Sequence, residues 1–271
     1  MNVRKAIIPA AGYGTRSLPI TKVLPKEMFP IAGKPAIHYI VEEAVAAGIE
    51  EVLIIVSRNK NVILDYFDRS LELEAFLAIN NKEYLLEKTT LPKVHIQYIR
   101  QPFARGLGDA VLLGERFAHG EPFAVLLPDD FFVTGGGVGA LEQLVERFYK
   151  TGKSTVAVQK MEKADLHQYG VIKPGQAQSG EASDITDIVE KPKVDPPSDL
   201  AVCGRYVFTP ELFSCLHSVL PGAGGEIQLT DGIRSMLKTS PCEALEVKGT
   251  RFDLGKEEEY YRLIEHYLKN R

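Results

Sequence analysis

The order of hydrophobic and polar residues divides the chain into two kinds of segment. Short runs of consecutive apolar residues, such as "EVLIIV" at Glu51–Val56, are typical of strands buried on both faces. Between such runs, apolar residues recur every three or four positions, as in the segment from Pro35 to Gly48, which predicts a helix. The same patterns predict strands at Lys5–Pro9, Val94–Arg100, Phe123–Leu127, Thr155–Gln159, Asp184–Glu190, Val202–Phe208 and Ala244–Val247, and helices at Asp109–Phe117, Val138–Tyr149 and from Lys256 onward.

This alternation predicts the fold class and the number of domains. Buried strands that alternate with helices are typical of βαβ units, so we expect an α/β protein with a mostly parallel sheet. The segments Lys173–Ser183 and Pro192–Ser198 are expected to be loops, the first of them in a β-hairpin. Neither is long enough to separate two domains. We therefore expect one domain over residues 1–271, with an inserted or appended region on the substrate side.

Charge is distributed unevenly along the chain. The formal net charge of the 271 residues is −4 at pH 7, which argues against nucleic acid or an anionic membrane as a partner. The first 34 residues nevertheless carry +5, which leaves −9 for the remainder. Their single acid is Glu27, and their basic residues are Arg4, Lys5, Arg16, Lys22, Lys26 and Lys34. A small polyanion is the class of ligand that suits this segment.

The cysteines indicate the compartment. Cys203, Cys215 and Cys242 are odd in number and lack the paired spacing of zinc ligands. We expect reduced thiols in a cytoplasmic protein rather than disulfides. No window is apolar over the length that a membrane span needs, and the first residues lack the apolar stretch of a signal peptide.

The turn after the first strand is built from small residues. Ala10–Gly14 follows the carboxyl end of that strand, which is where ligands bind in open α/β sheets. Small residues allow backbone N–H groups to approach a phosphate or a flat base. The dinucleotide-binding fingerprint does not fit, because Ser17 replaces its third glycine and Pro19 interrupts the helix. A tight structural turn without a ligand remains an alternative.

A cationic loop follows this turn. Arg16, Lys22 and Lys26 lie between Gly14 and Gly33, on a segment that prolines at 19, 25 and 30 make too broken for a helix or a strand. Ordering a loop costs about 1–2 kcal/mol per residue in backbone entropy, and proline reduces that cost. A stiff cationic loop at the ligand end of a sheet predicts a polyphosphate clamp. The alternative is a solvated loop.

Acidic residues follow a later strand. "LLPDD" ends an apolar run with Asp129 and Asp130, and hard oxygen ligands at a strand end suit Mg²⁺. Asp129, like Asp253 in "FDLG", could by itself be a helix cap or a turn residue. No histidine pairs convincingly with a serine or cysteine nucleophile, so we expect all six histidines to be structural or exposed.

These segments together resemble a known family. "PAAGYGTRSLPITKVLPKEMFPIAGKP" resembles the signature of the nucleoside-diphosphate-sugar pyrophosphorylases, and its "TK…PKEM" form is most similar to bacterial UTP–glucose-1-phosphate uridylyltransferases. The similarity continues as "RQ…GLGDAV", "LPDD", "YGVI", "VEKP", "GRYVF", "GEIQLTDGI" and "FDLG". It implies a Rossmann-like three-layer sandwich with a mixed, mostly parallel central sheet and small β-hairpin insertions. It also implies a nucleotide-binding part over about residues 1–135, a sugar-phosphate-binding part over about 136–255 and a C-terminal helix over about 256–271.

The resemblance implies a Mg²⁺-dependent reaction. An oxygen of glucose 1-phosphate attacks the α-phosphorus of UTP and yields UDP-glucose and pyrophosphate. Arg16 and Lys26 would grip the triphosphate and stabilise the leaving pyrophosphate. The metal ligands would be Asp129, which also belongs to the nucleotide site, and Asp253. Because a phosphate monoester has a second pKa of about 6, no general base is needed.

The remaining nucleotide-binding residues are expected on two turns. Ala11 and Gly12 would meet the uracil through their backbone, and Gly14, Thr15 and Lys22 would lie at the nucleotide. On the second turn, the residues matching Gln101 and Gly106 would recognise the pyrimidine edge, since an amide can both donate and accept. Gln101 could instead be a surface cap. Asp109 stands where the resemblance implies His.

The sugar phosphate would be held by "YGV" and "EKP". Gly170 would let the backbone approach the hexose, Glu190 would accept hydrogen bonds from its hydroxyls, and Lys191 would pair with its phosphate as a third catalytic cation. "GEIQLTDGI" either closes the pocket or begins a helix capped by Thr230.

Two alternatives to the uridylyltransferase remain open. One is a thymidylyltransferase, or a relative that uses another hexose 1-phosphate. The other is a weakly active regulatory paralogue that binds nucleotide sugars, a hypothesis motivated by Asp109 and by a tail after Gly255 that is shorter than the resemblance implies. The family also implies a homodimer or homotetramer.

Overall fold

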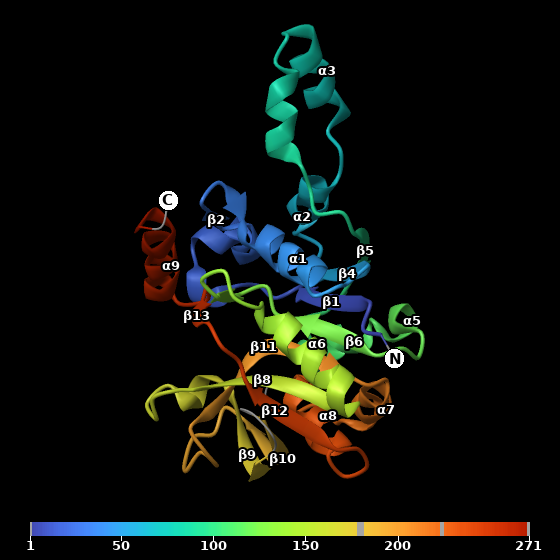
Figure 1. Cartoon of the computed structure of the whole chain (residues 1–271), viewed down its shortest axis with the longest axis vertical. Helices are drawn as coiled ribbons and strands as arrows, with labels where there is room; N and C mark the ends of the chain where they lie inside the picture. The colour runs from blue at the N-terminus through green and yellow to red at the C-terminus, as the bar shows by residue number, and fades with distance from the viewer. Residues whose placement is uncertain (1, 178–181, 223–224, 270–271) are drawn as a thin grey trace.

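A large mixed sheet forms the centre of the protein. The computed structural model describes residues 2–177, 182–222 and 225–269. Within those residues the sheet has nine strands, and helices lie on both of its faces (Figure 1). From edge to edge the order is β5 (His95–Arg100), β4 (Glu51–Val56), β1 (Lys5–Ala10), β6 (Phe123–Leu126), β11 (Leu200–Phe208), β8 (Ser154–Lys160), β12 (Cys242–Glu246), β10 (Ala182–Glu190) and β9 (Gly170–Ala177).

Most strands of this sheet run in one direction. The first four strands of the order form parallel pairs, and β8 and β12 form another. Only β10 and β11 run opposite to the other described strands of the sheet. The expected mixed, mostly parallel sheet is confirmed, and the strands predicted from apolar runs agree with the observed ones to within a few residues.

Alternate strand residues enter two hydrophobic layers. On β1, Ile8 belongs to a core shared with α1 (Ala36–Ala46), α6 (Ala140–Thr151) and α9 (Glu257–Lys269). Its neighbour Ile7 faces the opposite core, which contains residues of α4 (Leu107–Leu112), α5 (Glu115–Ala118), α7 (Glu211–Ser218) and α8 (Leu229–Met236). Both isoleucines are fully buried. Helices on both faces of one sheet make the three-layer sandwich that the resemblance implies.

One predicted helix is divided in two. The segment Asp109–Phe117 forms α4 and α5, with Gly114 between them. A Cβ on Gly114 would lie 3.0 Å from Cγ1 of Ile7, so the chain lies against β1 at this point and only glycine fits. Glycine is also a weak helix former, which explains why the helix does not continue through it.

Two small antiparallel sheets hold the loops at the ligand end. In the first, β2 (Pro30–Ile31) pairs with β3 (Lys34–Pro35) and closes the cationic loop. In the second, β7 (Asp130–Val133) pairs with β13 (Thr250–Asp253). Their register sets Asp253 opposite Asp130, so the second sheet joins the "LPDD" and "FDLG" motifs.

A helical arm projects from the body of the molecule (Figure 1). It contains α2 (Asn61–Phe67), α3 (Leu71–Ile79) and the 3₁₀-helix η4 (Glu83–Thr89). None of these helices was predicted from the sequence pattern. Several of the arm's large apolar side chains are exposed, namely Leu71, Leu73, Phe76, Ile79 and Tyr84.

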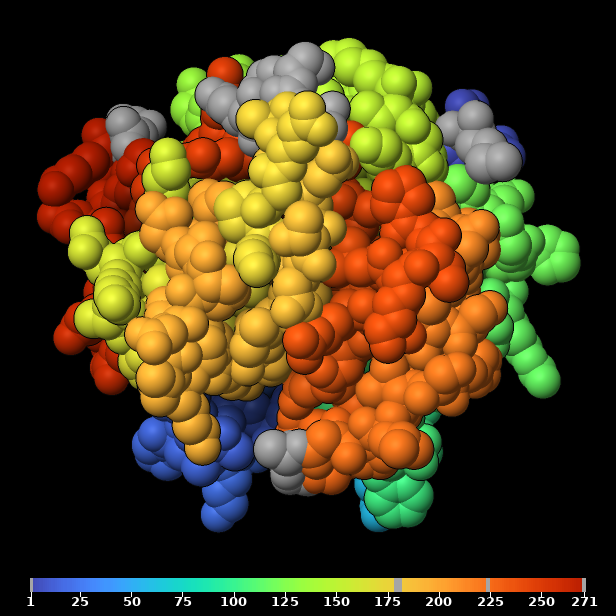
Figure 2. All heavy atoms as spheres, turned by 90° about the horizontal axis from the view of Figure 1, so that it is seen from below, coloured from blue at the N-terminus to red at the C-terminus, as the bar shows by residue number. Residues whose placement is uncertain are grey.

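The end of the molecule opposite the arm carries the predicted hairpin. Figure 2 shows this face, where β9 and β10 (yellow to gold) lie on one side and α8 (orange), which packs against β10, lies on the other. The strands extend to Ala177 and resume at Ala182, so the expected Lys173–Ser183 loop is shorter than predicted; residues 178–181 lie outside the described residues. In the described part of the chain, no helix is long and apolar enough to cross a membrane.

Candidate active site

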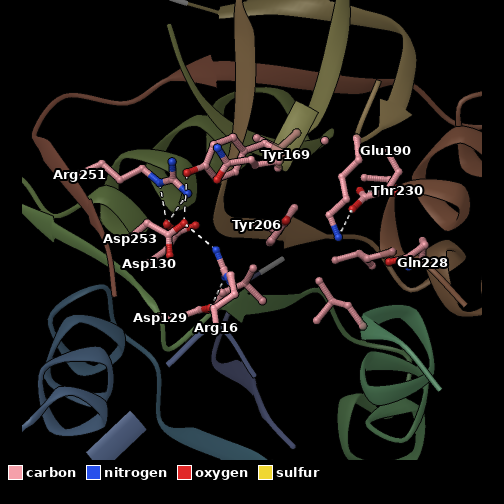
Figure 3. Close-up of a pocket in the computed structure, with 17 residues that line it drawn as sticks. Arg16, Asp129, Asp130, Tyr169, Glu190, Tyr206, Gln228, Thr230, Arg251 and Asp253 are labelled. Carbon is pink, nitrogen blue, oxygen red and sulfur yellow. Dashed lines mark hydrogen bonds and ion pairs between the residues drawn. The ribbon is translucent and has the colours of Figure 1, made fainter. Parts of the chain in front are cut away.

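A cavity of about 380 Å³ lies at the carboxyl ends of the central strands. Its walls contain side chains from the start, the middle and the end of the chain (Figure 3). Six of the predicted site residues line it: Arg16, Asp129, Gly170, Glu190, Lys191 and Asp253. Figure 3 shows a cluster of acids and guanidinium groups at one side, Glu190 and Thr230 at the other, and Tyr206 between them.

Arg16 and Lys26 converge on the same carboxylate. Arg16 lies on the first 3₁₀ turn of the cationic loop, and Lys26 begins the third. The Arg16 guanidinium lies 3.8 Å from Asp129 and 3.3 Å from Asp253, and Lys26 Nζ forms an ion pair with Asp129. Lys26 is therefore part of the same cluster, although it lines the adjoining hollow rather than the central cavity. The expected convergence of the two cations is found.

The ion pair fixes the charge of Asp129. Burial alone would raise its pKa, but the Coulombic attraction of Lys26, the hydrogen bond from it and the nearby Arg16 together hold the pKa at about 2. For Lys26, burial would lower the pKa, whereas Asp129 and Glu27 raise it, and the net direction is upward. Both groups therefore stay ionised across the neutral range.

Besides its contact with Arg16, Asp253 at the end of β13 accepts two further hydrogen bonds. The Tyr169 hydroxyl donates to Oδ2 over 3.1 Å, and the backbone N–H of Gly255 donates to Oδ1 over 2.8 Å. A Cβ on Gly255 would lie 2.6 Å from Cζ of Arg16 and 2.9 Å from Asp253 Oδ1. The glycine thus leaves room for the Arg16–Asp253 pair.

Asp130 also lines the cavity, but its carboxylate is occupied by structural partners. Its Oδ1 accepts from Nε and Nη2 of Arg251 at 2.6 and 2.5 Å, and its Oδ2 accepts from the backbone N–H of Gly204 at 2.8 Å. Arg251 also lies over the Tyr169 ring, 4.6 Å from its centroid. Of the two acids in "LPDD", Asp129 is therefore the one whose partners are the loop cations.

Two carboxylates of the cluster are candidates to hold a divalent ion. Within the described ranges, no group of three or more His, Cys, Asp or Glu side chains is placed to hold a metal ion. Asp129 and Asp253 nevertheless meet at one guanidinium. Mg²⁺ is commonly held by one or two carboxylates together with substrate phosphates, so this pair fits an ion that arrives with a nucleotide.

The opposite side of the cavity is arranged around Glu190. The Thr230 hydroxyl donates to Glu190 Oε2 over 3.0 Å, and Lys191 Nζ lies 3.4 Å from Oε1. A Cβ on Gly170 would lie 2.8 Å from Cγ2 of Thr230, so β9 can pack this closely against Thr230 only with glycine at this position. Lys191 has a left-handed φ of 46° and a largely exposed ammonium, a strained conformation of the kind that occurs at functional sites.

Several cavity residues were missed by the sequence analysis. Gln228 and Thr230 line the wall, so the first of the two interpretations of "GEIQLTDGI" is supported; Thr230 lies inside α8, and Gln228 occupies its N-cap position. Tyr169 begins the quoted motif "YGVI" and Arg251 directly precedes "FDLG", but nothing local indicated their contacts. All four residues lie in or next to the motifs that carry the family resemblance, and that position is the sequence feature that could have identified them.

The nucleotide-side residues line two adjoining hollows rather than the central cavity. The first contains Gly12, Thr15, Lys22 and Lys26, and the second contains Ala11 and Gln101. Tyr13, Ser57 and Asn59 line both hollows. Gly14, with φ 65°, shapes the loop by accepting a 2.8 Å hydrogen bond from the Thr21 hydroxyl.

Gly106 forms the second turn. It has φ 103°, and a Cβ there would lie 2.5 Å from the carbonyl oxygen of Ile227. The backbone of Gly108 donates to the same carbonyl over 2.8 Å. The turn that follows Gln101 is thereby packed against the segment that carries Gln228 and Thr230.

A buried ion pair beneath the cationic loop was also missed. Lys60 Nζ donates to both oxygens of Glu27 at 2.8 Å, and neither residue is more than 5 % exposed. Burial lowers the pKa of Lys60, although the Glu27 carboxylate opposes this shift. The pair fixes the residue next to Lys26 to the base of the arm.

The family of the chain follows from comparison with known proteins. A sequence model of the family described as Nucleotidyl transferase matches residues 5–270. The chain belongs to the nucleotidyl transferase family.

Individual members of this family resemble the chain over nearly its whole length. A UTP–glucose-1-phosphate uridylyltransferase of Streptococcus pyogenes is 50 % identical over 260 residues, which cover 93 % of this chain and 84 % of the relative. A UDP-glucose pyrophosphorylase structure complexed with UDP-glucose is 41 % identical, with a TM-score of 0.88 and coverage of 99 % and 100 % of the two chains. A UTP-bound enzyme of the same kind from Acinetobacter baumannii is 36 % identical, with a TM-score of 0.88 and coverage of 98 % and 93 %. The predicted resemblance to sugar-nucleotide pyrophosphorylases is confirmed.

Proposed function

We propose that this nucleotidyl transferase is a UTP–glucose-1-phosphate uridylyltransferase, which makes UDP-glucose and pyrophosphate. The observation that carries the proposal is the convergence of Arg16, Lys26, Asp129 and Asp253 across the cavity from Glu190 and Lys191. Relatives named for this activity, and similar structures that hold UTP or UDP-glucose, support the choice of substrates.

The chemistry requires cations in fixed positions rather than a proton acceptor. The second pKa of a phosphate monoester is about 6, so the attacking oxygen of glucose 1-phosphate is already ionised at neutral pH. Arg16 and Lys26 bind the triphosphate and stabilise the charge that develops on the departing pyrophosphate. Arg16 is 53 % exposed along its side chain, which leaves its planar fork free to turn toward phosphate oxygens.

Mg²⁺ is the proposed cofactor, and Asp129 and Asp253 are its proposed ligands. When bound, the ion neutralises phosphate charge and orients the α-phosphate for in-line attack. The chain's own contribution is to hold both carboxylates ready. Tyr169 and the backbone of Gly255 fix Asp253, and Lys26 holds Asp129 ionised.

The nucleotide would extend from the central cavity along the two adjoining hollows. Ala11, Gly12 and Gly14 provide a backbone that approaches the base, Thr15 and Lys22 lie beside the phosphates, and Gln101 with Gly106 meets the pyrimidine edge. This placement supports the division into a nucleotide-binding part at about residues 1–135 and a sugar-phosphate-binding part at about 136–255 of one domain.

The sugar phosphate is assigned to the opposite wall. Glu190 accepts hydrogen bonds from hexose hydroxyls, Gly170 allows the backbone to approach the ring, and Lys191 pairs with the phosphate. The Thr230 hydroxyl already holds Glu190 in place, so the carboxylate is oriented before the sugar enters.

A matrix of substrates tests this proposal. Initial rates of pyrophosphate release are measured with UTP and dTTP, each with several hexose 1-phosphates, in the presence of Mg²⁺. The highest kcat/KM is expected for UTP with glucose 1-phosphate. A preference for dTTP would support the thymidylyltransferase instead, and the absence of release with every pair would support the regulatory paralogue.

Assembly and location are part of the same proposal. The exposed apolar side chains of the arm favour a homodimer or homotetramer in which a second copy covers them. Light scattering of the purified protein tests this, and a monomer would contradict it. All three cysteines are free, which agrees with a cytoplasmic protein.

A further inference from the structure

The side-chain amide of Gln101 is held in one orientation. Gln101 directly follows β5, and its Nε2 lies 2.7 Å from Oδ2 of Asp109 and 3.3 Å from the carbonyl oxygen of Gly106. Gln101 and Asp109 are both buried, at 6 % and 4 % exposure. A carboxylate and a backbone carbonyl can only accept, so the amide nitrogen, and not the oxygen, must face them.

This orientation uses both amide hydrogens and leaves the oxygen. Among the described residues, no donor is hydrogen-bonded to Gln101 Oε1, whereas its nitrogen has two acceptors. Gln101 also lines the hollow of about 410 Å³ beside Ala11 and Tyr13. In this orientation the amide presents only an acceptor to the hollow, whereas the resemblance implies an amide that both donates to and accepts from the base.

Asp109 is itself fixed from its other side. Its Oδ1 lies 2.8 Å from Nη2 of Arg105, one turn earlier in the chain. Guanidinium nitrogens only donate, so Arg105 requires an acceptor at this position. The chain thus contains a relay in which Arg105 orients Asp109, and Asp109 orients Gln101.

The bases of UTP and CTP differ at the atom that this oxygen would meet. Ring N3 of uracil carries a hydrogen and donates, whereas N3 of cytosine is an acceptor. An acceptor on the protein therefore attracts uracil N3–H and repels cytosine N3. Sites built to hydrogen-bond one group reject an analogue without it strongly, because a buried polar atom is left unpaired.

We propose that Asp109 is a positioning residue that turns the Gln101 oxygen toward the base, so that the enzyme accepts pyrimidines with N3–H and rejects cytosine. The inference rests on the proposed function and on the assignment of Gln101 to the base. It gives a role to the residue at which the chain departs from the pattern that its resemblance implies.

The substitution Asp109→Asn tests the relay. Arg105 would donate to the amide oxygen of the new asparagine, so the asparagine –NH₂ group would face Gln101. Two –NH₂ groups cannot hydrogen-bond to each other, which disfavours the present orientation of the Gln101 amide. The ratio of kcat/KM for UTP to kcat/KM for CTP should fall at least about tenfold, the equivalent of one hydrogen bond. An unchanged ratio would overturn the proposal.

A rescue variant separates positioning from a general loss of structure. In Arg105→Ala/Asp109→Asn, the asparagine can turn its oxygen back to Gln101, so the ratio should recover most of its wild-type value. In Asp109→Ser the new side chain is too short to reach Gln101, so the UTP-to-CTP ratio should fall as it does in Asp109→Asn. With this second variant, the test does not depend on the folding of Asp109→Asn alone. If the double variant recovers neither the UTP-to-CTP ratio nor UTP binding, the relay is contradicted.

Glu115→Gln is the matched control. It removes one negative charge from the next helix, where Glu115 pairs with the exposed His217, and it should leave the ratio unchanged. A wild-type enzyme that transfers neither nucleotide would end the proposed function. If the wild type uses UTP but Asp109→Asn has the same UTP-to-CTP ratio, only this inference is contradicted and the proposed function stands.

Discussion

The guanidinium of Arg16 lies 3.3 Å from the carboxylate of Asp253, although 237 positions separate the two residues in the chain. One residue belongs to the cationic loop after β1, and the other ends β13. Their pairing is part of a larger cluster at the wall of the cavity, because Asp129 pairs with both Arg16 and Lys26. The two cations and the two carboxylates are thereby assembled before any substrate binds, which is what electrostatic catalysis of phosphoryl transfer requires.

Substitution of Gly255 should separate activity from stability. The Cβ of Gly255→Ala would overlap the Arg16 guanidinium, which lies at the far end of a flexible side chain and can move away. We expect a loss in kcat of about 10²–10³-fold, as for removal of one transition-state donor, with little change in Tm. Steady-state kinetics and thermal unfolding measure the two effects. Gly139→Ala, whose Cβ would meet nothing closer than 3.8 Å, should retain full activity, and equal losses in both variants would contradict this account.

The buried pair of Lys60 and Glu27 predicts a double-mutant cycle. Lys60→Met leaves the Glu27 carboxylate buried without its partner, which should cost about 3–5 kcal/mol of unfolding free energy. In Glu27→Leu/Lys60→Met no charge is left unpaired, and most of the stability should return. Urea denaturation measures both.

The exposed pair of Arg69 and Glu74 on the arm provides the control. Arg69→Ala should leave the denaturation curve unchanged, because that pair is surrounded by water. A double variant of Lys60 and Glu27 that is no more stable than Lys60→Met would show that the pair does not act as a unit.

The pH dependence of the reaction rate should arise from protonation of glucose 1-phosphate and not from a group on the enzyme. The pKa of Asp129 is depressed to about 2, so it loses its negative charge only in strong acid, and the raised pKa of Lys26 keeps its ammonium charged at alkaline pH. The kcat/KM for glucose 1-phosphate should therefore fall below about pH 6, where the phosphate gains its second proton.

A fluorinated glucose 1-phosphate, whose second pKa is lower, tests the origin of the fall in kcat/KM at acidic pH, the acid limb of the pH profile. The limb should move to lower pH by the difference between the two substrates' pKa values. A limb that stays in place would show that glucose 1-phosphate is not the group that titrates, which would contradict this account.

Lys191 should distinguish the two substrates. Lys191→Ala removes a charged hydrogen bond to the sugar phosphate and is expected to lower kcat/KM for glucose 1-phosphate about 10–100-fold. The Kd for UTP, measured by calorimetry, should stay close to the wild-type value. Lys193→Ala removes an exposed lysine two positions away and serves as the control. A variant that loses UTP binding instead would mean that the two substrates have been exchanged in the cavity.

The strands and the central helices could be predicted from local pattern. "EVLIIV" coincides with β4 because a strand covered by helices on both faces needs apolar residues at successive positions. The arm could not be predicted in this way. Leu71, Phe76 and Ile79 of α3 are exposed, so no single apolar face marks the helix in the sequence.

The cavity was predicted in outline but not in its contacts. Arg16, Asp129 and Lys191 were found because each lies in a distinctive motif. The pairing of Asp130 with Arg251 depends on the register of β7 and β13, two strands about 120 residues apart, which no local pattern encodes. The single orientation of Gln101 likewise depends on a contact that becomes visible only when its surroundings are in place.

Pyrophosphate release from UTP and glucose 1-phosphate with Mg²⁺, measured for the wild type and for Asp129→Ala, tests the central claim most directly. The wild type should release one pyrophosphate for each UDP-glucose formed, and the variant should be slower by at least about 10²-fold, because both the lysine contact and a proposed metal ligand are lost. Equal rates in the two proteins, or no release by the wild type, would contradict the account.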